Sequence, residues 1–302
     1  MTARLARGTA VATFALIVLG AIVRATGSGL ACPDWPLCHG RILPPLQPQV
    51  LLEWGHRAVA LVVSLSTAVL AGRILLVASA RRVLGGLVGL ALALLAMQVV
   101  LGALTVWKLL HFSVVTLHLG NALLFFATLL AIADRADRAD CTGDAATAGP
   151  APSAGGGRLL WTLAALATLV QILLGGLVST NHAGLACPDF PLCHGAWWPT
   201  GEGTLVHLQL AHRFGAYALA AFLVLAWARS RGATNPQVRA GAGAVLGLMF
   251  VQIVLGAFNV LLAVPVWLTA AHLATATALF ALVVITALRA GVSAASAASV
   301  AP

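Results

Sequence analysis

Four histidines occupy matching positions in two repeated segments of the chain, and their imidazoles could bind a metal. The segment "EWGHR" at 53–57 returns as "QLAHR" at 209–213, and "TLHLGNALLF" at 116–125 returns as "AAHLATATALF" at 270–280. The repeat therefore pairs His56 with His212 and His118 with His272. Each histidine lies a few residues past the start of an apolar stretch, so a helical rise of about 1.5 Å per residue places all four at similar depth.

Two neutral imidazoles from neighbouring helices, with no cluster of thiolates or carboxylates beside them, suit the two axial positions of haem iron. We therefore expect His56 and His118 to ligate one haem, and His212 and His272 to ligate another. A single histidine inside a membrane is more often a hydrogen-bonded core residue. Four at one depth favour ligation, because an ionisable group in hydrocarbon is costly without a function.

The residues around these histidines differ between the two copies. Glu53 lies three residues before His56, about one turn away on the same helical face, whereas the corresponding residue of the second copy is Gln209. A carboxylate at only one site predicts that only this site handles protons, with Glu53 as general base or electrostatic stabiliser. The alternative is an interfacial carboxylate that pairs with Arg57. Arg57 and Arg213 could hold haem propionates, or could extend towards lipid headgroups.

The composition indicates the environment in which these residues must lie. Of 302 residues, 61% are hydrophobic and 8% are charged, and the mean hydropathy of +0.99 lies outside the range of soluble domains. The chain is predicted to be an integral membrane protein in contact with a lipid bilayer. Its net charge of +9 comes from scattered Lys and Arg residues, not from a basic face with interleaved aromatics, so we expect no nucleic acid partner.

Eight apolar stretches are long enough to cross a hydrocarbon core of about 30 Å as helices. They span residues 8–24, 51–72, 83–107, 112–133, 159–178, 205–228, 239–262 and 266–288. The predicted fold is thus an all-α membrane protein with eight transmembrane helices. The first stretch resembles a signal peptide, but the fifth is its counterpart in the second copy, and an internal copy cannot be a signal.

The positive charges orient these helices. Twelve of the seventeen Lys and Arg residues lie before the first helix, in alternate loops or at the end of the last helix. Because short cytoplasmic loops retain positive charge, both termini are predicted to be cytoplasmic, in a multi-pass protein of the cell membrane.

The repeat extends over the whole chain, since "QVVLGAL" at 98–104 also returns as "QIVLGAF" at 252–258. Two copies of a four-helix unit, in the same orientation, should form two pseudo-symmetric bundles related by an axis along the membrane normal. We expect an N-terminal half at 1–133 and a C-terminal half at 159–302. Between them, 134–158 is rich in Asp, Ala, Gly and Pro and is predicted to be a flexible cytoplasmic linker.

Each half also carries a loop with two cysteines, which this topology places on the outer, oxidising side of the membrane. "GLACPDWPLCHG" at 29–40 and "GLACPDFPLCHG" at 184–195 differ at one position. The compartment favours a disulfide in each loop. A redox-active dithiol, or a soft-metal site that includes the adjacent histidines, are alternatives. The residues concerned are Cys32, Cys38, Cys187, Cys193, His39 and His194.

With these motifs in this order, the chain resembles the bacterial haem A synthases over nearly its whole length. The resemblance implies oxidation of the C8 methyl group of haem O to a formyl group, which yields haem A for terminal oxidases. It implies a substrate haem in the first half, a persistent haem b in the second, and a carboxylate at Glu53 that is needed for turnover. It also implies a disulfide between Cys32 and Cys38.

The same resemblance implies a partnership with haem O synthase, the farnesyltransferase that makes haem O. A membrane redox partner would take up the electrons that haem b relays. Two other functions use the same histidines: a di-haem electron-transfer cytochrome, and a haem transporter or chaperone. The first predicts two equivalent permanent haems and no role for Glu53. The second predicts reversible loading of unaltered haem.

Overall fold

The computed structural model describes residues 1–142 and 156–290, and within these ranges the fold consists of long helices. A single turn of 3-10 helix, η1 (Ala183–Leu185), precedes the second cysteine pair. The α-helices are α1 (Thr2–Ala25), α2 (Pro48–Leu76), α3 (Ala78–Trp107), α4 (Phe112–Thr142), α5 (Gly156–Thr180), α6 (Thr204–Ser230), α7 (Pro236–Leu261) and α8 (Val266–Ala290).

Each of these eight helices is long and apolar enough to cross a membrane, which confirms the predicted spans. Large apolar side chains such as Leu61, Val69 and Phe250 are more than half exposed on the outside of the helices. In water such a surface would be unfavourable, whereas in a bilayer it faces lipid. The protein is therefore a multi-pass membrane protein. The helices run on beyond the predicted bounds by up to nine residues, because their polar ends continue outside the apolar stretch.

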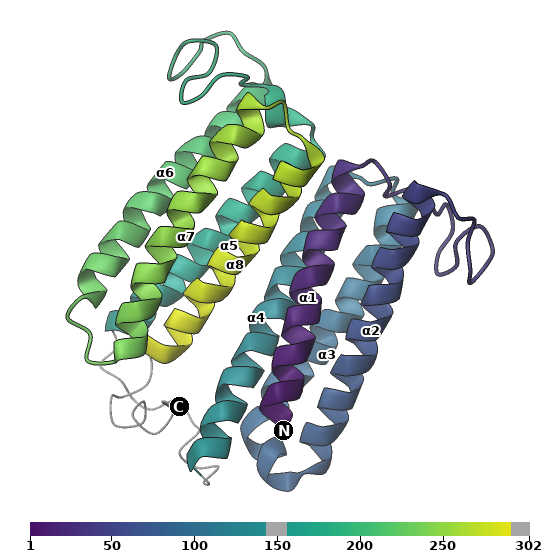
Figure 1. The fold of residues 1–302 in the computed structure, drawn as a ribbon, viewed down its shortest axis with the longest axis vertical. Coiled ribbons are helices and arrows are strands. Elements are labelled where there is room, and N and C mark those ends of the chain that lie inside the picture. The colour runs from purple at the N-terminus through teal and green to yellow at the C-terminus, as the bar shows by residue number, and fades with distance from the viewer. Residues whose placement is uncertain (143–155, 291–302) are drawn as a thin grey trace.

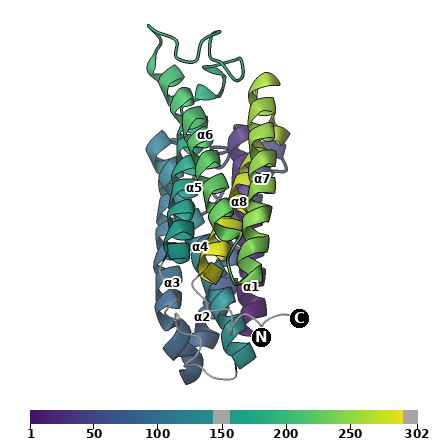
Figure 2. The same cartoon turned by 90° about the vertical axis from the view of Figure 1, so that its left-hand side faces the viewer.

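The helices form two groups of four (Figure 1). In the first, α1 and α3 each contact both α2 and α4; in the second, α5 and α7 each contact both α6 and α8. The groups meet through α1, α4, α5 and α8, and a side view shows all the helices running along one long axis (Figure 2). One buried apolar cluster joins Phe125 and Phe126 of α4 to Phe280 of α8. The predicted symmetry axis between the groups stays a prediction.

The start of the predicted linker is helical, which corrects the sequence-based expectation for residues 134–142. Helix α4 continues to Thr142 because Asp134 and Arg138 form an ion pair one turn apart, at 2.6 Å. Arg7 of α1 donates to Asp137 at 3.0 Å and ties this extension to the neighbouring helix. Helix α5 likewise takes up 156–158. The rest of the predicted linker, 143–155, lies outside the described residues.

Two loops project from the end of the bundles at which the even-numbered helices begin (Figure 1). The first cysteine loop, residues 26–47, joins α1 to α2, and the second cysteine loop, residues 181–203, joins α5 to α6. Met1 lies at the opposite end of the molecule. Every even-numbered helix therefore runs away from the cysteine loops, and the first two turns of each helix lie just beneath them.

Candidate functional site

The four predicted ligands lie at equivalent heights in the two bundles. His56 and His212 each lie eight residues past the first residue of their helices, α2 and α6, while His118 and His272 each lie six residues past the starts of α4 and α8. All four are thus near the end of the bundle that carries the cysteine loops. His56 and His118 lie close enough to interact electrostatically, as do His212 and His272. The structure therefore brings the predicted ligands together in two pairs.

Each histidine ring packs against a glycine of the preceding helix. A Cβ added to Gly20, Gly102, Gly175 or Gly256 would lie 2.9–3.4 Å from the Cε1 atom of the facing histidine. Real Cβ atoms rarely approach another heavy atom so closely. The facing residues are His56, His118, His212 and His272, in that order. Only glycine leaves this space, so the backbones of the odd-numbered helices form one wall of each imidazole pocket.

Three glutamines contact three of these rings. Gln98 and Gln252 each lie 3.2 Å, through Nε2, from Nε2 of His118 and His272 respectively. Gln171 lies 3.0 Å from Nδ1 of His212. Sequence reasoning missed the glutamines. The signal was available, because each of the four glycines ends a similar apolar segment: "LIVLG", "QVVLG", "QILLG" and "QIVLG".

The donor set fits haem better than a cluster-bound metal ion. Among residues 1–142 and 156–290, no group of three or more His, Cys, Asp or Glu side chains could hold a metal ion. Haem needs only two axial donors, since the porphyrin supplies the other four. Nδ1 of His56, His118 and His272 is buried without a hydrogen-bond partner in the structure. Paired imidazoles with free ring nitrogens beside glycine walls are therefore the arrangement that a flat macrocycle requires.

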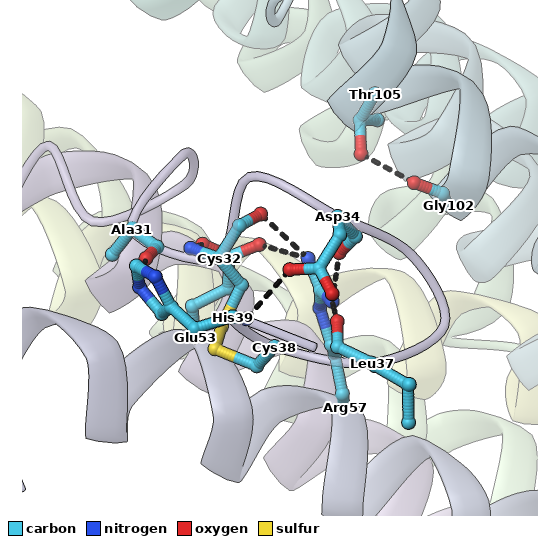
Figure 3. A network of polar contacts seen from close by, with 10 residues as sticks. All are labelled: Ala31, Cys32, Asp34, Leu37, Cys38, His39, Glu53, Arg57, Gly102 and Thr105. Atoms are coloured by element: carbon cyan, nitrogen blue, oxygen red, sulfur yellow. Dashed lines mark hydrogen bonds and ion pairs between the residues drawn. A yellow bond between two sulfur atoms is a disulfide. The ribbon is translucent and has the colours of Figure 1, made fainter. Parts of the chain in front are cut away.

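Glu53 lies three residues before His56 in α2, and its carboxylate is tied to the first cysteine loop (Figure 3). The residue is 5% exposed. Its Oε2 accepts a hydrogen bond from the main-chain N–H of Cys32 at 2.7 Å, and its Oε1 pairs with Arg57 at 2.5 Å. The ion pair with Arg57 that the sequence offered as an alternative is thus present. Both carboxylate oxygens have partners, so Glu53 links α2 to the loop that covers it.

Arg57 completes this network. One terminal nitrogen donates to the carbonyls of Asp34 and Leu37 at 2.7 and 2.6 Å, and the other donates to the carbonyl of Cys32 at 3.1 Å and to Glu53. These four contacts use all four terminal N–H groups of the guanidinium. Arg57 therefore binds the loop backbone, and the predicted contact with a haem propionate stays a prediction.

The second half keeps the arginine contacts and lacks the carboxylate. Arg213 donates to the carbonyls of Leu192 and Cys187, the latter at 2.6 Å. Gln209 donates weakly to the carbonyl of Gly184 at 3.4 Å, and its Oε1 is buried without a partner. From α6, the second cysteine loop is thus held by the bonds of Arg213 and by this one weak bond of Gln209. The difference between Glu53 and Gln209 is therefore a difference in how each loop is anchored.

Both cysteine pairs are oxidised in the structure. Disulfide bonds join Cys32 to Cys38 and Cys187 to Cys193, as the sequence predicted. Nε2 of His39 forms a hydrogen bond with the main-chain carbonyl of Ala31 at 2.9 Å, and His194 makes the equivalent bond with Ala186. Both rings therefore stabilise the backbone of their own loop. Sulfurs held in disulfides do not act as thiolate ligands, so the soft-metal alternative loses its donors.

An aspartate shapes each cysteine loop. Asp34 accepts hydrogen bonds from the main-chain N–H groups of His39 and Gly40 at 2.6 and 2.8 Å, and Asp189 does the same at 194 and 195. These donors, with Gly40 foremost, hold the pKa of Asp34 below its usual range, and Arg57 adds to the effect. The N–H of Gly195 is foremost in lowering the pKa of Asp189. Both loops therefore favour an ionised carboxylate.

This architecture defines a class: a membrane protein with two groups of four helices, each with a half-buried histidine pair near a disulfide loop. The sequence matches the COX15-CtaA family, described as cytochrome oxidase assembly protein, over residues 3–51 and 47–284, and the chain belongs to that family.

Three relatives carry the name Heme A synthase. The protein from Shewanella oneidensis is 31% identical, with 89% of this chain and 90% of the relative covered. That from Methylobacterium nodulans is 32% identical, with 87% and 84% covered. The protein from Caulobacter vibrioides is 31% identical, with 89% and 90% covered. The similarity therefore extends over nearly the full length of each chain.

Proposed function

We propose that this protein is a haem A synthase, an oxidoreductase that converts the C8 methyl group of haem O to a formyl group and so makes haem A for terminal oxidases. The full-length relatives of that name support the reaction. The buried carboxylate of Glu53 is the observation that links this reaction to a particular site. It lies one turn from His56, and the corresponding residue of the second half is Gln209.

In this proposal the two halves have different tasks. His56 and His118 hold the substrate haem in the N-terminal half, 1–133, and His212 and His272 hold a resident haem b in the C-terminal half, 159–302. Iron in the resident haem supplies one-electron chemistry when bound. With water as the source of the new oxygen atom, conversion of a methyl to a formyl group releases four protons and four electrons, and a redox partner in the membrane takes up the electrons. The glycine walls and the glutamines orient the imidazoles.

Glu53 provides negative charge next to the substrate site. Its nearest partners, Arg57 and the N–H of Cys32, hold the carboxylate in place while the first cysteine loop is closed. From this position it stabilises positive charge that develops at the methyl carbon, or accepts the proton that leaves it. Gln209 carries no charge, so it can neither stabilise a positive charge in this way nor accept a proton. This fits a haem in the second half that is not chemically altered.

Charge asymmetry supports a multi-pass protein of the cell membrane with both termini in the cytoplasm and the cysteine loops outside. Haem O reaches the site from the bilayer, where haem O synthase makes it with its apolar farnesyl tail. For Arg57 or Arg213 to hold haem propionates, each would have to exchange some of its bonds to the loop carbonyls for bonds to the propionates.

Expression with a source of haem O tests the function directly. Pigments are extracted and separated by chromatography, and their masses are determined. A haem A synthase yields the formyl product or its hydroxylated precursor, and the Glu53→Ala variant should yield neither while both haems stay bound. Two unaltered, equivalent haems would instead identify an electron-transfer cytochrome. Reversible loading of unaltered haem would identify a transporter or chaperone.

A further inference from the structure

The four histidines are not equally supported by the helix that precedes each of them. Gln98, Gln171 and Gln252 contact His118, His212 and His272. His56 makes no such contact with a glutamine in the described structure, and neither ring nitrogen of His56 has a hydrogen bond there. One ligand of the first pair therefore lacks the polar support that both ligands of the second pair have.

The repeat gives the reason for this difference. Gln171 lies four residues before the glycine that walls the His212 ring, and the equivalent position in α1 is Leu16. Gly215, three residues after His212, is replaced by Val59 in the first half. A Cβ added to Gly215 would overlap Oε1 of Gln171. The second half thus has both the carboxamide and the space for it, whereas the first half has neither.

Gln171 holds His212 at two points. Its Nε2 contacts Nδ1 of the ring at 3.0 Å and donates to the main-chain carbonyl of His212 at 2.7 Å. If His212 ligates through Nε2, its proton lies on Nδ1, and the amide must turn so that Oε1 accepts that proton in place of the bond from Nε2 to the carbonyl. Hydrogen bonds of this kind fix the orientation of a ligating ring, and their loss typically weakens metal binding about 10- to 100-fold.

We propose that Gln171 is the positioning residue that makes His212 a permanent haem ligand, and that Leu16 in its place leaves His56 able to release haem. The inference rests on the proposed function and deepens it. A resident haem must be retained through turnover, whereas a substrate haem must enter and its product must leave. A ring already held in place loses little freedom when it binds, so its haem dissociates slowly. An unsupported ring must be ordered again at each exchange.

The test uses full-length protein in which His56 and His118 are both replaced by Ala, so that only the second pair can bind haem. Haem b is loaded, and its transfer to excess apomyoglobin is followed by absorbance. Gln171→Leu should speed this loss about 10-fold or more. Gln171→Glu, which retains an acceptor at the same reach, should restore retention. Val170→Leu, at a neighbouring residue that is 56% exposed, is the matched control and should leave the rate unchanged.

The midpoint potential of the haem separates positioning from a general loss of stability. Removing the hydrogen bond in Gln171→Leu should raise the potential, because the imidazole then donates less electron density to ferric iron. A carboxylate in Gln171→Glu should lower it. Shifts of opposite sign support the proposal. Equal potentials and equal loss rates in Gln171→Leu and Val170→Leu would overturn it.

The reciprocal change tests the first half. In protein with His212→Ala and His272→Ala, the pair Leu16→Gln with Val59→Gly should slow the loss of haem from the first site. An unchanged rate would refute the part of the proposal that concerns Leu16. If the chain with all four histidines binds no haem at all, the proposed function itself fails. If haem binds but replacement of Gln171 does not change its retention, only the inference about Gln171 fails and the proposed function stands.

Discussion

The carboxylate of Glu53 accepts a hydrogen bond from the main-chain N–H of Cys32 at 2.7 Å, so the buried acid of α2 is bound directly to the disulfide loop above it. Arg57 bridges the same two residues through the carbonyl of Cys32 and the other carboxylate oxygen. The group expected to do chemistry is therefore also the group that closes the first cysteine loop, and the two roles can be separated by experiment.

Replacement of Glu53 should affect the loop and the reaction to different degrees. Glu53→Ala removes the ion pair and the acceptor for Cys32, and leaves Arg57 with main-chain carbonyls but no carboxylate as partners, which costs on the order of 3 kcal/mol of loop closure. Glu53→Gln keeps an oxygen for the N–H of Cys32 and should hold the loop better. Both variants should lose haem A formation if the charge is required. Hydrogen exchange at residues 26–47 reports on the loop, and pigment analysis reports on the reaction.

The equivalent change in the second half, Gln209→Ala, serves as the control for the loop. Because Gln209 makes one weak hydrogen bond, exchange at residues 181–203 should change little. Haem A formation by Glu53→Gln at the original rate would remove the carboxylate from the mechanism.

Addition of a single methyl group to a glycine wall should expel haem. In Gly175→Ala the new Cβ would lie 2.9 Å from Cε1 of His212, so the ring must move away from its present position. We expect loss of most of the haem from the second site, measured as haem per polypeptide. Gly247→Ala in α7 adds the same methyl group where no atom lies within 4 Å and should bind haem normally. Full haem content in Gly175→Ala would mean that the wall is not part of the site.

Removal of the first disulfide should loosen its loop without releasing haem. Cys32 and Cys38 are six positions apart, and the closure of so short a chain stabilises it by about 2 kcal/mol. The double replacement by Ser should therefore speed proteolysis of the first cysteine loop and retain the haems, because the ligands lie in the helices. If turnover stops while haem stays bound and the loop stays protected, the pair carries electrons as well.

Acid should open both cysteine loops. The pKa of Asp34 and of Asp189 lies below the ordinary value of 3.8 in the folded protein. A carboxyl with a depressed folded-state pKa stabilises the fold fully above its unfolded pKa, and this stabilisation is lost as the pH falls through the lower, folded-state value. Loop protection should thus be constant above about pH 5 and fall below about pH 4.

Variants in which Asp34 and Asp189 are replaced by Asn provide the comparison. Their loops should already be loose at neutral pH, because a neutral amide accepts the two main-chain hydrogen bonds less strongly. Hydrogen exchange of the loops should then show little further change in acid. An acid transition of unchanged size in these variants would assign the pH dependence to other groups.

Much of this fold follows from local sequence. Apolar stretches of membrane-spanning length predicted all eight helices, because a helix in lipid must satisfy its own backbone hydrogen bonds. The internal repeat paired His56 with His212 and His118 with His272, and the outer compartment predicted the disulfides. The extension of α4 beyond residue 133 was missed, since it depends on Asp134, Arg138 and a contact with Arg7 of another helix.

The sequence by itself determined which residue types recur and at what depth, because helical rise and bilayer thickness fix the position of a residue along its own helix. Only the tertiary structure decided which residues touch. Packing of α5 against α6 placed Gln171 on His212, and folding of the loop over α2 gave Glu53 its two partners. Such contacts depend on the rotation and separation of neighbouring helices, which no single helix encodes.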